Sequence, residues 1–84
     1  MLNKTGFKIY PNPVKDFVNI EFDNDIQGGD IRIFDLSGKL VYHKSLHSLR
    51  STVISFDLNN LKSGTYILEI SSGTLLERAL FLKE

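Results

Sequence analysis

The apolar residues of this chain recur at every second position within short runs, which is the spacing of β-strands. The segment 17–22 shows it most plainly, because Val18, Ile20 and Phe22 alternate with polar residues. One face of this strand is therefore expected to be buried and the other to face water. No segment of ten or more residues carries the apolar stripe of an amphipathic helix, so the sequence predicts an all-β fold.

Clusters of Gly, Pro, Asn, Asp and Ser separate the runs and predict turns between seven strands. Ile31 and Ile33 of the third strand are expected to point inward, as are Tyr66, Leu68 and Ile70 of the sixth. Seven short strands with frequent turns are typical of an immunoglobulin-like Greek-key β-sandwich of antiparallel strands, with a small barrel as the competing architecture. The expected strands span residues 7–10, 17–22, 31–35, 39–44, 52–58, 66–70 and 75–82, with a polar connection at 45–51.

Three turns contain residues with specific backbone chemistry. Pro11 and Pro13 withhold two backbone donors, so they end the first strand. Asp35 can accept a bond from the backbone two residues on and Gly38 can take a positive φ, which together predict a four-residue hairpin turn. A further tight turn is expected at Ser71–Thr74.

Leu61, Gly64 and Tyr66 have the pattern of a tyrosine corner. In such a corner, a Tyr near the start of a late strand donates its hydroxyl to the backbone just upstream. A corner here supports the Greek-key topology. The plainer alternative is that Tyr66 is a half-buried strand aromatic with no special role.

The charge and composition of the chain exclude several classes of partner. Ten basic and ten acidic side chains cancel, which removes the positive field that attracts nucleic acid or an anionic membrane. The chain has no cysteine, so it has no disulfide and no thiolate metal site.

No apolar run is long enough to span a bilayer and no signal-peptide pattern begins the chain, so an export signal is expected on a longer precursor if the protein is exported. We expect one domain at 7–84, preceded by a linker or expression remnant at 1–6.

Few residues combine into a pattern that supports chemistry. His43 and His47 have the spacing of metal ligands on a helix but straddle a strand end and a loop, so solvated histidines are the favoured interpretation. Asp23, Asp25 and Asp30 could offer carboxylates to calcium, but no bidentate Glu follows, so a solvated turn is favoured. No nucleophile, base and orienting residue occur together. The sequence therefore predicts no enzyme, no cofactor, no metal site and no small-molecule substrate.

Three motifs occur in order, followed by a last strand that ends in Lys83. They are the opening Tyr10, Pro11, Asn12, Pro13; the hairpin Ile33, Phe34, Asp35, Leu36, Ser37, Gly38, Lys39, Leu40, Val41; and the corner Leu61, Lys62, Ser63, Gly64, Thr65, Tyr66, Ile67. Together they resemble the type A C-terminal sorting domain of the type IX (Por) secretion system, found on cargo proteins of certain Gram-negative bacteria. The resemblance covers the chain from Phe7 onward, and Glu84 departs from the usual basic ending.

This resemblance implies a tail that directs a cargo protein through an outer-membrane translocon to the cell surface. It implies arrival by way of the periplasm, and removal by a surface sortase that cuts just upstream of the domain. The cut bond would then lie within Met1–Gly6 or in cargo sequence before it. The implied partners are translocon components and the sortase.

The last strand indicates how such a tail could be recognised. Both of its faces are partly apolar, because Leu76, Leu80 and Leu82 alternate with Ala79 and Phe81. If the strand lies at a sheet edge, its free backbone groups could pair with a strand of a translocon or carrier protein, or support weak self-association. A fibronectin-like carbohydrate-binding or adhesive module that presents aromatic residues on one face is the alternative function, since fold alone does not separate the two.

Overall fold

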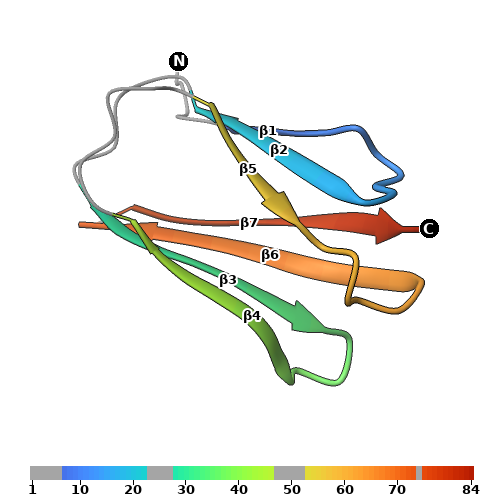
Figure 1. Cartoon of the computed structure of the whole chain (residues 1–84). Helices are drawn as coiled ribbons and strands as arrows, with labels where there is room; N and C mark the ends of the chain where they lie inside the picture. The colour runs from blue at the N-terminus through green and yellow to red at the C-terminus, as the bar shows by residue number, and fades with distance from the viewer. Residues whose placement is uncertain (1–6, 23–27, 47–52, 74) are drawn as a thin grey trace, which may run out of the picture.

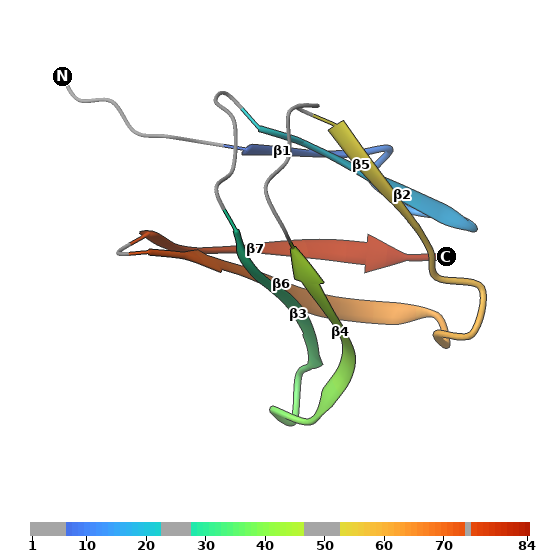
Figure 2. The same cartoon turned by 60° about the vertical axis from the view of Figure 1, so that its left-hand side comes forward.

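The computed structural model describes residues 7–22, 28–46, 53–73 and 75–84, and these form seven strands in two sheets (Figure 1). One sheet has the order β1-β2-β5 and the other the order β4-β3-β6-β7, with every neighbouring pair antiparallel. The sheets lie face to face (Figure 2), which confirms the predicted immunoglobulin-like sandwich in place of a barrel. The strands are β1 (Phe7–Tyr10), β2 (Phe17–Phe22), β3 (Gly29–Asp35), β4 (Leu40–Leu46), β5 (Val53–Asp57), β6 (Gly64–Ser72) and β7 (Leu75–Lys83).

The core lies between the two sheets and consists largely of the faces that the alternation predicted. The inward residues predicted for β2, β3 and β6 are all buried. Each large apolar side chain removed from water in this way contributes about 1.5–3 kcal/mol relative to an exposed position. The buried apolar residues are Val14, Val18, Ile20, Phe22, Ile31, Ile33, Leu46, Phe56, Leu58, Tyr66, Leu68, Ile70 and Phe81.

Two strands on the β4 side are longer than expected. β3 begins at Gly29 rather than Ile31, and a side chain at Gly29 would collide with the carbonyl of Ser71 on the neighbouring strand. β4 continues to Leu46, which pairs with Gly29 and is buried. Leu46 was expected in a polar connection, and this was wrong because pairing with β3 extends the ladder beyond the local alternation.

The hairpin between β6 and β7 is also tighter than expected. Ser71 and Ser72 belong to β6 and pair with Leu76 and Leu75, so the predicted turn at Ser71–Thr74 is shorter than four residues. Gly73 takes a φ of 60°, the left-handed conformation that glycine adopts without steric cost.

Several predictions fall on residues that the structure does not describe. These are the linker at 1–6, Asp23 and Asp25 of the acidic loop, His47, Thr52 at the start of the fifth strand, and Thr74. Within the four described ranges, no helix has the length and apolar character needed to cross a membrane.

Candidate functional site

The end of β7 is held by the motif that opens the domain. The N–H of Val14 donates to the carbonyl of Leu82 at 2.7 Å, and the N–H of Glu84 donates to the carbonyl of Val14 at 2.7 Å. The Leu82 N–H donates to the Asn12 Oδ1 atom at 3.1 Å. Residues 12–14 thus form a strap beside residues 82–84, with a parallel bridge between Val14 and Lys83. The opening motif and the last strand, remote in sequence, meet in one place.

Lys83, the basic residue of the chain's ending, is 6% exposed. Its backbone pairs with Gly64 of the corner on one side and with Val14 on the other. Its Nζ atom donates to the main-chain oxygen of Glu84 at 3.0 Å. Lys83 therefore lies within the fold, where a partner cannot reach most of its side chain.

The hairpin between β3 and β4 forms as predicted. The Oδ1 atom of Asp35 accepts from the Ser37 N–H at 2.9 Å, the Ser37 hydroxyl at 2.6 Å and the Lys39 N–H at 2.9 Å. These bonds, the Ser37 hydroxyl first, hold the pKa of the Asp35 carboxyl below its ordinary value. Gly38 has a φ of 91°, as expected for a turn that needs glycine.

The tyrosine corner is present. The Tyr66 hydroxyl donates to the carbonyl of Lys62 at 2.7 Å, which favours the corner over the half-buried strand aromatic. The ring of Tyr66 is buried and stacks on Phe81 of β7 with centroids 5.7 Å apart. Gly64 has a φ of 154°, which a residue with a side chain rarely adopts. The corner therefore supports β7 from the core side.

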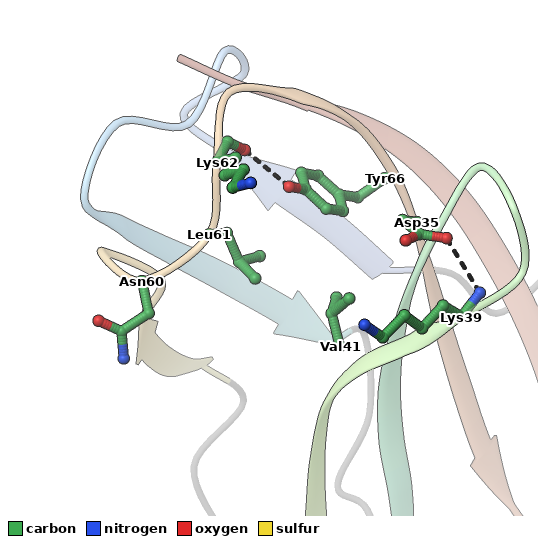
Figure 3. Close-up of a pocket in the computed structure, with 7 residues that line it drawn as sticks. All are labelled: Asp35, Lys39, Val41, Asn60, Leu61, Lys62 and Tyr66. Carbon is green, nitrogen blue, oxygen red and sulfur yellow. Dashed lines mark hydrogen bonds between the residues drawn. The ribbon is translucent and has the colours of Figure 1, made fainter.

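The hairpin and the corner together line a pocket of about 260 Å³ (Figure 3). Lys39 and Lys62 approach it from opposite sides, and none of the ion pairs in the described part of the chain involves either lysine. One oxygen of the Asp35 carboxylate, Oδ1, accepts the three bonds of the turn. The lining residues of the pocket are Asp35, Lys39, Val41, Asn60, Leu61, Lys62 and Tyr66.

The backbone of β7 is open between Leu76 and Leu80. In an antiparallel pair, the N–H and C=O groups of alternate residues face away from the neighbouring strand. Leu82 is such a residue, because its groups bond the strap, and Leu80, Arg78 and Leu76 follow at two-residue steps without a register shift. Among residues 7–22, 28–46, 53–73 and 75–84, none bonds these outward groups. The segment Leu76–Leu80 is therefore an open edge.

An ion-pair network crosses the outer face of the four-stranded sheet. Arg78 donates through Nε to Glu69 Oε2 at 3.0 Å, and Arg32 lies 3.6 Å from the other oxygen of this carboxylate. The Oδ1 atom of Asp30 accepts a hydrogen bond from His43 Nε2 at 2.9 Å, and this contact is the first cause of the lowered pKa of Asp30. Asp30 and His43, each considered as a metal ligand, are thus engaged with each other. The described part of the chain holds no group of three metal-binding side chains.

Sequence reasoning missed two features of this site. Val14 lies between the first two expected strands, yet it is fully buried against the end of β7, and nothing local in the sequence signals that contact. The Glu69–Arg78 pair was the second, because the expected turn at Ser71–Thr74 would place Glu69 opposite Leu76, whereas the observed pairing of Ser72 with Leu75 places Glu69 opposite Arg78. The role of the predicted motif residues in recognition remains a prediction.

Comparison with known proteins supports this description. The sequence matches the family described as "Secretion system C-terminal sorting domain" over residues 8–81. No curated protein matches it. A solved structure of a DUF3244 family protein with an immunoglobulin-like β-sandwich fold, from Bacteroides vulgatus, is similar with a TM-score of 0.74. That match has 23% identity and covers 93% of this chain and 84% of the other, so it shows the fold. The chain belongs to the family of secretion system C-terminal sorting domains, the tails of type IX secretion cargo that its three motifs predicted.

Proposed function

We propose that the folded domain is the sorting signal, and that the type IX machinery recognises it through the open edge of β7. A sorting tail of this family directs its cargo to the cell surface or the medium. The single observation that supports recognition through β7 is the open edge at Leu76–Leu80, where backbone donors and acceptors have no neighbouring strand within the described part of the chain. Such an edge is a template for β-augmentation by a strand of another protein.

The motifs fit this proposal because they hold β7 in place. The strap bonds residues 82–84, and Tyr66 of the corner stacks on Phe81. We propose that the motif residues act in this indirect way, as determinants of the fold that presents β7. The hairpin contributes by joining β3 to β4 at the far side of the same sheet.

The remaining steps follow from the family and belong to the same proposal. The cargo reaches the periplasm by the general export route, a translocon component binds the tail, and the cargo crosses the outer membrane. A surface sortase then removes the domain by cutting upstream of Phe7. The domain acts throughout as a substrate of other proteins and supplies no catalytic group.

Secretion of a reporter tests the proposal. A fluorescent protein with an export signal is fused to residues 1–84 and expressed in a host that has the type IX translocon. We expect the fusion to reach the medium or the cell surface, and to remain in the periplasm when residues 75–84 are deleted. Equal export of the two fusions would contradict the proposal.

Because the deletion also removes the core residue Phe81, a milder pair of variants isolates the edge. Leu80→Pro removes one outward N–H of β7 and leaves the bonds to β6, as proline is tolerated at an edge position of this kind. Leu40→Pro at the exposed start of β4 is the matched control. We expect only Leu80→Pro to reduce export at equal melting temperature. Loss of export in both variants would indicate a general requirement for folding.

The adhesive or carbohydrate-binding module has less support. Such a module presents aromatic rings on one exposed face, whereas the exposed large apolar residues of the described sheets are mostly leucines. Tyr10 and Phe17 are the exposed aromatics among them. Binding of the isolated domain to a glycan array, with no export of the reporter, would favour the module instead.

A further inference from the structure

The outer face of the four-stranded sheet carries an apolar row that ends at the open edge. Phe34 of β3 lies opposite Leu40 on one side and Ile67 on the other, and Ile67 lies opposite Leu80 of β7. These residues face away from the core, because their neighbours Ile33 and Leu68 are buried. Leu80 is 62% exposed, the largest fraction in the row. The row therefore stops at β7 with its last side chain uncovered.

A charged row runs beside the apolar one. His43, Arg32, Glu69 and Arg78 lie opposite one another across β4, β3, β6 and β7. The side chain of Glu69 is 12% exposed and accepts from Arg78 while also facing Arg32. The Glu69 carboxylate thus forms ion pairs with two guanidinium groups. The side chain of Arg78, at the open edge, is 61% exposed and has room for a second carboxylate.

A strand that pairs with β7 would continue both rows, since side chains directly opposite in neighbouring strands lie about 4.5–5.5 Å apart. Cross-strand pairs favour apolar residues opposite apolar ones and acidic residues opposite basic ones. The residues opposite Leu76, Arg78 and Leu80 would share the outer face of the extended sheet.

We infer that the partner of β7 is an extended protein segment with an acidic side chain opposite Arg78 and apolar side chains opposite Leu76 and Leu80. This inference rests on the proposed function, because it names the chemistry of the strand that the open edge binds. The pattern is apolar, any, acidic, any, apolar. The central charge sets the register, and the two apolar residues cover the exposed leucines.

A second copy of this chain fits the edge poorly. An antiparallel pair of β7 strands that uses the whole open segment Leu76–Leu80 must be centred on Arg78. Arg78 would then lie opposite Arg78 of the other copy, and like charges directly opposite are destabilising. A shift toward the C-terminus meets the strap at residues 82–84. The charge of the edge thus favours a different chain with a carboxylate at the central position.

Peptide binding followed by NMR tests this inference on the whole 84-residue chain. The probes are two capped seven-residue peptides with threonine at alternate positions and valine, glutamate, valine or valine, lysine, valine between them. We expect the glutamate peptide to shift the amide resonances of Leu76, Arg78 and Leu80 and to bind about fivefold more tightly than the lysine peptide. Arg78→Glu should reverse this order, and Arg78→Gln should abolish it.

Equal affinity of the two peptides for the unmodified chain would overturn the inference, as would resonance shifts confined to β4. A concentration-dependent dimer that excludes both peptides would also overturn it and favour self-association. The reporter separates this failure from that of the proposed function. If Leu80→Pro reduces export at equal melting temperature while the peptides show no charge preference, only the inference is contradicted. If export continues without residues 75–84, both the inference and the proposed function are contradicted.

Discussion

The two edges of the four-stranded sheet differ in ways that bear on function. β4 is paired with β3 through an irregular register between Ile33 and Phe34, and its exposed stretch is His43, Lys44 and Ser45. Lys44 lies on the core side of the sheet, opposite Ile31, yet is exposed. Bulges and lysines of this kind are the means by which proteins keep an edge from pairing with other chains.

β7 has fewer of these protections. It pairs with β6 over nine residues without a register shift, and Leu76, Leu80 and Leu82 are exposed along it. Glu77 is its one charge on the core side within the open segment Leu76–Leu80. The strap covers the C-terminal end of the strand but leaves that segment open. The two edges therefore differ in the features that limit pairing with another strand, and β7, the edge of the proposed recognition, has fewer of them.

The largest effect is expected from removing the residue that anchors β7. Phe81 is 2% exposed and stacks on Tyr66, so Phe81→Ala should lower the free energy of unfolding by about 3–5 kcal/mol. Tyr42→Ala removes the half-buried ring of β4 that contacts Phe56, and should lower the free energy of unfolding by only about 1–2 kcal/mol. Urea titration of both variants measures the difference. Equal losses would mean that the two edges are anchored alike.

Two glycines test how each edge is held by its turn. Gly64→Ala and Gly38→Ala each place a side chain at a positive φ and should cost about 1–3 kcal/mol. Gly64 pairs with Lys83, whereas Gly38 lies in the β3–β4 hairpin, so only the first should also shift the amide resonances of β7. Thermal melting and NMR spectra of the two variants provide the comparison. Unchanged melting of Gly64→Ala would contradict the assigned turn.

The strap offers a smaller and more local change. Asn12→Ala removes the acceptor of the Leu82 N–H and should cost about 0.5–1.5 kcal/mol. In the unmodified chain we expect the Leu82 amide to exchange with solvent more slowly than the amides of Leu80 and Arg78, and this protection should be lost in Asn12→Ala. If hydrogen exchange is equally fast at Leu82 and Leu80 before the substitution, the strap does not close the end of β7.

The smallest expected effect is on the stability of the domain at acid pH, through two carboxyl groups next to β4. The pKa values of Asp30 and Asp35 are lowered from 3.8, chiefly by the His43 contact and the Ser37 hydroxyl respectively. The stability that they contribute is present above pH 3.8 and is lost as the pH falls through their lower folded pKa values. Asp30→Asn and Asp35→Asn should therefore reduce the amount by which the free energy of unfolding falls as the pH is lowered. If the double variant loses as much stability in acid as the unmodified chain, these two carboxyl groups do not contribute to the pH dependence.

The parts of the fold that depend on local sequence could be predicted. Alternation placed the inward residues of β2, β3 and β6 correctly, because side chains on a strand change face at each residue. The corner was also predictable, since the Tyr66 hydroxyl bonds a residue four positions away. Turn chemistry is similarly local, as the bonds of Asp35 show.

Contacts between remote segments could not be predicted in the same way. The burial of Val14 depends on β7 arriving beside it, and the contact of Arg32 with Glu69 depends on the register of β3 on β6, which no tight turn fixes. The pocket likewise forms where a hairpin and a corner from different parts of the chain meet. The sequence could predict an open edge only if the last strand lies at the edge of its sheet, because the order of the strands depends on the whole fold.

The strap has a consequence for the timing of biosynthesis. Val14 leaves the ribosome long before residues 82–84, and its backbone bonds to them cannot form until synthesis has passed those residues. Contacts between such distant positions are also among the slowest to form in a folding chain. A translation product that stops before residue 82 therefore never closes its β-sandwich in this way. The bonds of the strap thus distinguish a chain that has been synthesised through residue 84 from one that stopped before residue 82.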